Sequence, residues 1–427
     1  MTGPLRIAVV GGGVAGITAA HLLQRKHIVT LYERDRQIGG HANAARIEEP
    51  LDGHGASRRT VEVDTAFLIF HSGSYPLFMQ LLREWGLQDR CIDVEMSFGF
   101  LNQKSGLRYT VNRGIGGAFV QPHNVLRPRY LRLLAEIYRF RRSNFSDLEG
   151  DEKTTLGEYL RRRGYSESFI EDFIFPMGVS VWSLPLRGML SFPAATFARF
   201  FAHNRMLKMA HGARWQTLRG GSRQYIRAFL RNFRGQVETG YAVQAVRRPL
   251  SGRPRIVLKN SREHEYDRVV IATHADDALR LLRESATAKE RRLLGAWRYS
   301  AAKTVLHTDA SVLPGNNLES WGSWNVVYTP GADATVTYDI TRIQRPANRK
   351  QYFVTIGDVD VNRSKVLHRY EYRHPLYDAR AIATQRHLWE LNTGDGVLYC
   401  GSYFGRGFHE DAIRSASHVA EGLGVEW

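Results

Sequence analysis

The sequence has few cysteines and lacks the signatures of several protein classes. Its 427 residues include only Cys91 and Cys400, so we expect no disulfide framework and a reducing compartment. No CxxC pair or other metal-ligand spacing occurs, and we expect no metal. No run of about 18 apolar residues predicts a spanning helix. We expect no signal peptide, because the first apolar run leads straight into a glycine turn, and therefore a cytoplasmic protein.

Acidic residues are scarce relative to basic ones. Asp and Glu number 42 against 59 for Lys and Arg, which gives a formal net charge of +17. The excess gathers beside aromatic residues at 127–142, 161–163 and 192–209. This pattern is typical of a solvated basic face or of helices on an anionic membrane, and both interpretations stay open. The second would place the protein at the inner membrane face. No nucleic-acid-binding motif is present, and we expect no such partner.

Glycine, by contrast, is concentrated where a phosphate group would need close approach. Arg6–Val10 predicts a short buried strand, and a glycine-rich turn and a helix follow it. Gly11 suits the tight turn, Gly13 lets the backbone approach a pyrophosphate, and Gly16 lets the helix pack on the strand. Val14 and Ala15 form the start of the helix, and the positive N-terminal end of the helix therefore faces the phosphates.

A second predicted strand, Ile28–Glu33, ends on a carboxylate that can accept hydrogen bonds from an adenosine ribose. Strand, glycines, helix, strand and acid in this order predict an ADP-binding βαβ unit. A Gly-Gly pair, Gly39-Gly40, follows shortly after.

From Glu33 to His41 the sequence resembles the flavin-containing amine oxidase and phytoene desaturase superfamily. The resemblance implies FAD as cofactor, held by the glycine turn and by Glu33, Arg34, Gly39, Gly40 and His41. Later segments resemble the same superfamily: Leu218–Ser222, Val237–Val246, Tyr266–Ala272, Val397–Gly401 and Gly405–Ala412. By this resemblance Val243 lies at the adenine. Gly401, His409, Glu410 and Asp411 lie at the flavin.

Shorter motifs narrow the resemblance. They are His41-Ala42-Asn43, Val63-Asp64-Thr65, Met96-Ser97-Phe98, Trp182-Ser183, Trp321–Asn325 and Gly407–Asp411. They resemble the predicted NAD/FAD-binding oxidoreductases that are often encoded beside cyclopropane-fatty-acid-synthase-like methyltransferases. This likeness implies a role with modified fatty acids and a methyltransferase as a partner.

The expected fold class is α/β: a Rossmann-type, amine-oxidase-like FAD-binding domain, discontinuous in sequence, with an inserted α+β substrate domain. By resemblance the FAD domain comprises residues 1–70, 215–290 and 385–427, and the substrate domain 71–214 and 291–384. The first insert is predicted to be mostly helical, and the second strand-rich.

Two residues are candidates for catalysis. Lys303, on a predicted strand, occupies a place comparable to a lysine that holds water at the flavin in many relatives, but an outward-facing lysine is the alternative. His409 begins the last helix, where it can act as acid or base, while Glu410 and Asp411 also suit a helix N-terminus. Substrate-binding candidates are Trp321, Trp324, Asn325, Tyr403 and Phe404, with core packing as the alternative.

The sequence thus predicts an FAD-dependent oxidoreductase that exchanges a hydride with its substrate. The resemblance implies a long apolar substrate, such as an unsaturated or methyl-modified fatty acyl chain, which would be desaturated, saturated or isomerised. The open alternatives are an amine or amino-acid oxidase that uses O₂ and a non-catalytic flavoprotein partner of a lipid methyltransferase. A nicotinamide-linked dehydrogenase is disfavoured, since no second GxGxxG is present.

Overall fold

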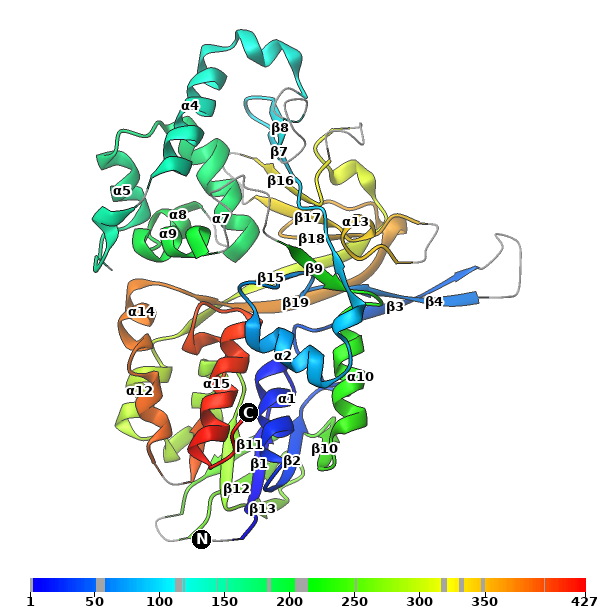
Figure 1. Cartoon of the computed structure of the whole chain (residues 1–427), viewed down its shortest axis with the longest axis vertical. Coiled ribbons are helices and arrows are strands. Elements are labelled where there is room, and N and C mark those ends of the chain that lie inside the picture. Colours follow the sequence, from blue (N-terminus) through cyan, green and yellow to red (C-terminus); the bar gives the residue numbers. More distant parts are fainter. Residues whose placement is uncertain are drawn as a thin grey trace.

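A computed structural model gives the arrangement of the chain (Figure 1). It describes residues 3–50, 58–111, 117, 120–143, 145–151, 153–182, 186–203, 214–249, 252–315, 321–329, 334–346, 350–394 and 396–427. Residues 204–209 of the third basic segment lie outside the described residues.

A five-stranded parallel sheet forms one end of the molecule, with strand order β10-β2-β1-β14-β20. The strands are β1 (Arg6–Val10), β2 (Ile28–Glu33), β10 (Gln236–Thr239), β14 (Arg268–Ile271) and β20 (Val397–Tyr399). β1 is the central strand, and Ile7, Ala8 and Val9 are fully buried, as a strand covered on both faces requires. The predicted bounds of β1 and β2 are confirmed.

Helices from both ends of the chain pack with this sheet: α1 (Val14–Leu23) and α15 (His409–Gly422). Helix α10 (Arg223–Asn232), from the middle of the chain, packs with α1. In Figure 1, α1 and α15 lie side by side, and both termini are at this end of the molecule.

A seven-stranded sheet forms the other half, with order β19-β15-β18-β17-β16-β7-β8. Its strands are β7 (Phe98–Asn102), β8 (Leu107–Val111), β15 (Arg298–His307), β16 (Trp324–Tyr328), β17 (Thr335–Asp339), β18 (Phe353–Ile356) and β19 (Val366–Leu376). The predicted strand-rich character of the second insert is confirmed. The first insert is mostly helical, as predicted, but it also contains the β7–β8 hairpin, whose strand β7 pairs in parallel with β16.

The pattern of the first insert predicts helices at 75–85, 128–142, 155–163 and 167–173, and all four are present. They are α2 (Pro76–Glu84), α4 (Pro128–Arg142), α5 (Leu156–Arg162) and α6 (Glu167–Phe169), which continues as a π-helix to Ile174. Local chemistry sets two of their starts. Pro128 opens α4, where a missing N–H removes no helical bond. Thr155 and Glu158 form a capping box at α5.

The remaining elements are short. They are β3 (Ala44–Pro50), β4 (Arg58–Asp64), β5 (Phe70–His71), β6 (Cys91–Asp93), β9 (Trp215–Leu218), β11 (Val243–Arg247), β12 (Arg255–Leu258), β13 (Glu263–Glu265), α7 (Phe175–Trp182), α8 (Leu186–Leu190), α9 (Ala194–His203), α11 (Ala275–Leu282), α12 (Ala288–Leu294), α13 (Ile340–Gln344) and α14 (Ala379–Gln385). Across the described ranges, no helix is long and apolar enough to cross a membrane.

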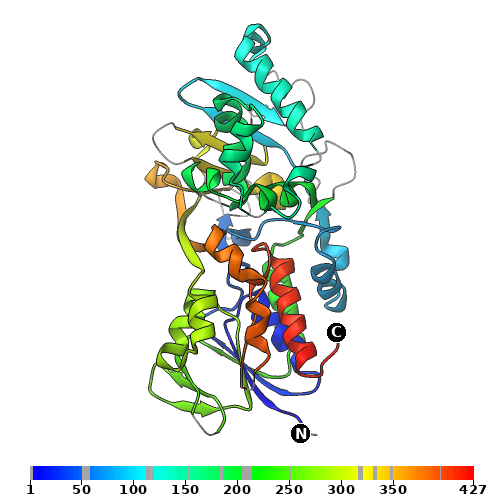
Figure 2. The same ribbon diagram turned by 90° about the vertical axis from the view of Figure 1, so that its left-hand side faces the viewer.

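Helix α2 packs with the helices that cover the parallel sheet. The division drawn from the sequence assigns this helix to the substrate domain. Phe78, Leu81 and Leu82 are fully buried in one cluster with Ile17 of α1 and Ile413 of α15. Figure 2, turned by 90° from Figure 1, also shows α2 beside the parallel-sheet half.

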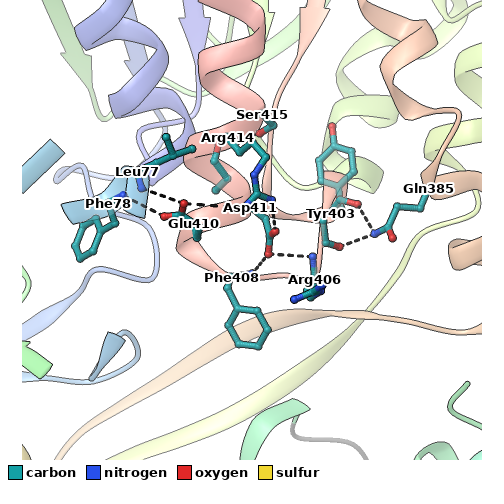
Figure 3. Close-up of polar contacts among 12 residues, drawn as sticks. Leu77, Phe78, Gln385, Tyr403, Arg406, Phe408, Glu410, Asp411, Arg414 and Ser415 are labelled. Carbon is teal, nitrogen blue, oxygen red and sulfur yellow. Dashed lines mark hydrogen bonds and ion pairs between the residues drawn. The ribbon is translucent and has the colours of Figure 1, made fainter. Parts of the chain in front are cut away.

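The contact between α2 and α15 has a polar component. The backbone N–H groups of Leu77 and Phe78 each donate to the Glu410 carboxylate at 3.0 Å (Figure 3). These N–H groups belong to the first turn of α2, which has no intrahelical acceptor for them. Tyr75 precedes the helix and offers no side-chain cap, so a carboxylate from another helix provides it.

We predict that Glu410→Gln lowers stability by about 1–2 kcal/mol, because one of the two acceptor oxygens becomes an NH₂ group, which faces a backbone N–H of α2 that then has no acceptor. Thermal or urea unfolding measures this change. Glu421→Gln, at the exposed end of the same helix, is the matched control and leaves stability unchanged. Equal stability of the two variants would contradict the capping role of Glu410.

Candidate cofactor and substrate site

The glycine turn after β1 is tightly packed at two positions and open at a third. Gly11 has φ +108°, and a Cβ there would lie 2.9 Å from the carbonyl oxygen of Ala272. A Cβ at Gly16 would overlap the carbonyl oxygen of Gly11. At Gly13, a Cβ would meet no atom within 4 Å. The protein thus leaves space beside Gly13, at the N-terminus of α1, where an anionic group is favoured.

Glu33 lies beside this turn, at the end of β2. Its carboxylate accepts hydrogen bonds from the N–H groups of Gly12, at 2.8 Å, and Asp35, at 3.0 Å. Burial raises the pKa of Glu33 despite these two donors. Arg34 is exposed, with its guanidinium 4.0 Å from the Asp35 carboxylate. The structure therefore brings Glu33, but not the Arg34 side chain, to the glycine turn.

The second glycine pair lies against the first. The Gly39 N–H donates to the carbonyl of Gly12 at 2.8 Å, and Gly39 and Gly13 form a parallel bridge. A Cβ at Gly40 would lie 3.2 Å from the Cα of Gly13. Gly39 and Gly40 both have positive φ, at 139° and 57°, so glycine suits both positions.

His41, immediately after this pair, belongs to a cluster of aromatic side chains from three separate segments. Its ring centroid lies 6.0 Å from that of His274, 5.4 Å from that of His374 and 5.2 Å from that of Tyr372. His274 precedes α11 and stacks on Tyr299 at 4.4 Å, while His374 and Tyr372 lie on β19.

The three histidines are neutral at neutral pH. Burial lowers the pKa of His41 to about 4 and those of His274 and His374 to about 3. Nε2 of His41 and Nδ1 of His374 are buried without a hydrogen-bond partner among the described residues. Two unpartnered nitrogens in one cluster indicate a place for a ligand with polar atoms.

Residues at the start of α15 contact two different parts of the protein. His409 stacks on Phe67 at 3.6 Å between ring centroids, and its Nε2 lies 3.1 Å from the Tyr225 hydroxyl. Burial lowers the pKa of His409 to about 3. The Asp411 carboxylate accepts from the N–H groups of Arg406 and Phe408, at 2.9 and 3.2 Å (Figure 3). Glu410 caps α2, so the side chains of both acids serve the fold.

The predicted substrate residues lie in two places. Tyr403 and Phe404 are buried in the loop before α15. Trp321 packs against Phe353, and its Nε1 donates to the carbonyl of Gly315 at 2.6 Å. Trp324 packs edge-on against Tyr338. These two tryptophans belong to the seven-stranded-sheet half.

The side chains of two further candidate residues, Asn325 and Lys303, form hydrogen bonds away from the histidine cluster. The Asn325 amide bonds back to Gly322 at 2.8 and 2.9 Å, which fixes the turn before β16. Lys303 is 67% exposed, and its Nζ donates to Asp358 at 2.8 Å, which raises its pKa. The structure therefore does not bring Lys303 to the histidine cluster. We call the half of the molecule built on the five-stranded parallel sheet the nucleotide half. Val243 is the first residue of its strand β11, and Gly401 follows the end of its strand β20.

A cleft lies beside the start of α15, between α9 and α14. All the space between its walls, open solvent included, amounts to about 290 Å³, and the cavity proper is only about 20 Å³. Its lining residues are Thr196, Phe200, Tyr377, Ile382, Gln385, Gly405 and Arg406. Phe200 also stacks on Phe408, at 5.1 Å between ring centroids, next to His409.

Sequence reasoning missed His274, His374 and Tyr372. His274 comes shortly after a predicted parallel strand that ends near Ala272. Since ligands bind at the carboxyl ends of parallel strands, this position could have identified His274 as a site residue. His374 and Tyr372 carry no motif, because only the pairing of β19 with β15 places them opposite Ser300 and Ala302.

Taken together, these residues fit FAD. The open space at Gly13 and the N-terminus of α1 suit the pyrophosphate, and Glu33 suits the ribose. The unpartnered nitrogens of His41 and His374 suit the polar edge of a flavin ring.

We predict that Gly13→Ala abolishes FAD retention while leaving the fold of the apoprotein intact, since its Cβ meets no protein atom. Gly16→Ala, the matched variant, disturbs folding itself, because its Cβ overlaps Gly11. The flavin absorbance of purified protein and the apoprotein melting temperature separate the two effects. A Gly13→Ala protein with full flavin content would contradict this placement of the phosphates.

Stability should also fall as the pH falls below about 6.5. Each of His41, His274, His374 and His409 has a folded-state pKa below its ordinary value of 6.5. Between that value and the folded pKa, the unfolded chain binds more protons than the folded one, so acid favours unfolding. Urea unfolding at pH 5 and pH 7 measures the difference, and we expect His374→Gln to reduce it. An unchanged pH slope in this variant would contradict a neutral His374.

Comparison with known proteins identifies a flavin family. Residues 14–364 match the family described as flavin containing amine oxidoreductase. A search of curated proteins finds no match.

Solved structures share the fold at low identity. A provisionally assigned protoporphyrinogen oxidase from Exiguobacterium sp. 255-15 has 18% identity and a TM-score of 0.68, over 98% of each chain. A CLA-producing fatty acid isomerase from P. acnes has 13% identity and a TM-score of 0.66, over 98% of each chain. Putrescine oxidase bound to putrescine has 15% identity and a TM-score of 0.64, over 98% of this chain and 99% of the other. The chain is an FAD-dependent oxidoreductase and belongs to the flavin-containing amine oxidoreductase family.

Proposed function

We propose that this oxidoreductase acts on a long, uncharged apolar chain, such as an unsaturated or methyl-modified fatty acyl group. The observation that carries the proposal is the neutrality of the histidine cluster. His41, His274 and His374 are uncharged at neutral pH, since burial lowers their pKa values to about 3 or 4. A cationic amine gains nothing from such a site unless a carboxylate faces it.

The two carboxylates beside His274 are already paired. Asp276 and Asp277 follow His274 and both contact the guanidinium of Arg373. Asp277 also pairs with Arg280. The same three residues, His274, Asp276 and Asp277, have the spacing of a metal site, but the two arginines occupy the carboxylates. The charge balance therefore disfavours both an amine and a divalent cation here.

The lining of the cleft between α9 and α14 matches the chemistry of an apolar chain with an acidic end, but its cavity of about 20 Å³ is too small to hold such a chain as it stands. Phe200, Tyr377 and Ile382 supply apolar surface, and the exposed Arg406 lies among the lining residues. A guanidinium binds carboxylate or phosphate through paired hydrogen bonds. The similarity to a fatty acid isomerase structure supports this proposal, while the similarity to putrescine oxidase supports the amine alternative.

FAD supplies a hydride acceptor or donor when it is bound. The protein has to supply the accompanying proton transfer and an environment that excludes water. We assign the proton transfer to His374, whose Nδ1 is buried without a partner and which comes from the seven-stranded sheet. His409 holds the start of α15 through Phe67 and Tyr225, and Lys303 has no role in this proposal.

We predict that unsaturated fatty acids or their phospholipid esters undergo a change in double bonds when they are added anaerobically to the FAD-loaded protein. Flavin bleaching reports net oxidation of the substrate, and product analysis detects an isomerisation that leaves the flavin oxidised. His374→Gln should lower kcat by about 100-fold while FAD content is retained. His368→Gln, an exposed histidine on the same strand, is the control and keeps full activity.

Bleaching by amines such as putrescine, with no effect of lipids, would overturn the proposal in favour of an amine oxidase. A flavin that responds to no lipid and no amine would favour a non-catalytic partner of a lipid methyltransferase.

A further inference from the structure

Exposed apolar side chains are concentrated on one segment of the substrate half. Among the described residues, four of the large exposed hydrophobic side chains lie on the 3₁₀ turn Pro122–Leu126 and on α4. They are Val125, Leu126, Leu131 and Tyr138, and Leu126 and Tyr138 are 82% and 62% exposed. We call this surface, comprising residues 122–142, the α4 face.

The apolar residues of α4 divide between two sides of the helix. Tyr130, Leu133 and Phe140 are buried, and Phe140 packs against Phe169 at 5.5 Å between ring centroids. This side anchors the helix in the substrate half.

Leu131, Ala135 and Tyr138 lie on the opposite side, at spacings of four and three residues, and all three are exposed. The Arg142 guanidinium donates to the Tyr138 hydroxyl at 2.7 Å and lies over its ring, which is a contact within α4 itself. This second stripe therefore does not anchor the helix in the substrate half, and it is free to meet an apolar surface.

The same segment is strongly basic. Residues 122–142 contain six arginines and a single acidic residue, Glu136. Glu136 is buried, and its carboxylate accepts a hydrogen bond from the Ser166 N–H at 3.1 Å. Arg127, Arg132 and Arg142 are exposed, so the α4 face presents arginines beside leucines and a tyrosine. Arg132 also pairs with Glu136 at 3.4 Å, which leaves the other five arginines of the segment in excess over its single acid.

The α4 face lies at the end of the molecule opposite both termini and the parallel sheet (Figures 1 and 2). Binding there would leave the nucleotide half clear of the surface. Phosphates alone would be matched by arginines, but exposed leucines require an apolar phase as well. An anionic bilayer supplies both, since its headgroups are negative and its acyl chains lie just beneath.

We propose that the α4 face docks onto the surface of an anionic phospholipid bilayer, with Leu126, Leu131 and Tyr138 at the headgroup–acyl boundary and the arginines among the phosphates. The proposal is independent of the proposed chemistry, because vesicle binding is measured without turnover.

The test is co-sedimentation of the FAD-loaded protein with vesicles of phosphatidylglycerol or of phosphatidylcholine. We expect at least about tenfold tighter partitioning to the anionic vesicles, and weaker binding at high salt. Leu126→Glu with Leu131→Glu should weaken binding at least about tenfold. Ile28→Glu with Leu230→Glu, two exposed residues of the parallel-sheet half, is the matched control and keeps wild-type binding.

A second pair of variants separates charge from apolar contact. Arg127→Gln, Arg132→Gln and Arg142→Gln together should weaken binding to phosphatidylglycerol at least about tenfold. The control is the triple variant Arg83→Gln, Arg231→Gln and Arg234→Gln, which removes the same charge from the other half. Equal losses in test and control variants would overturn the proposal, because they would show a non-specific effect of net charge. Binding to a DNA duplex but not to vesicles would overturn it in favour of a nucleic-acid partner.

Discussion

The structure depends on the close approach of backbone segments at the glycine turn. β1, the start of α1 and the Gly39-Gly40 segment meet where no side chain intervenes, and the Gly39 N–H reaches the carbonyl of Gly12 at 2.8 Å. The carboxylate of Glu33 completes this junction by accepting from the Gly12 N–H. Because these groups bond to one another, the protein itself fixes the shape of the turn, and a cofactor phosphate finds its binding surface already formed.

The long antiparallel pair β15–β19 builds the rest of the site from this junction. These strands belong to the seven-stranded sheet, yet Tyr372 and His374 of β19 reach His41 beside the glycine turn. The Asn43 side chain donates to the Tyr372 hydroxyl at 2.9 Å, so the two halves are also joined by a hydrogen bond. The proposed reaction site is thus composite: the nucleotide half positions the cofactor, and the other half brings the neutral imidazole of His374 to it.

Local patterns in the sequence were sufficient for the first βαβ unit. The apolar run at Arg6–Val10, the glycines and the acid Glu33 depend on neighbours within one βαβ unit, and their positions agree with the structure. Helix α4 was equally predictable, since Pro128 and the spacing of its buried residues mark its extent. Each of these signals is carried by residues close in sequence.

The histidine cluster depends instead on long-range pairing. His374 reaches His41 only through the register of β19 on β15, and no local pattern states that register. Strand β7 was missed for the same reason, because its partner β16 lies far along the chain. Lys303 was suggested by its strand, but a strand alternates its two faces, and this residue faces Asp358 and solvent.

A crystal structure of the FAD-bound protein would test the central claim most directly, since it locates the cofactor relative to the glycine turn and the histidines. The account predicts the pyrophosphate over Gly13, the ribose at Glu33, and a polar edge of the flavin ring within hydrogen-bonding distance of His41 or His374. A flavin ring that lies away from both histidines, with their nitrogens still unpartnered, would contradict it.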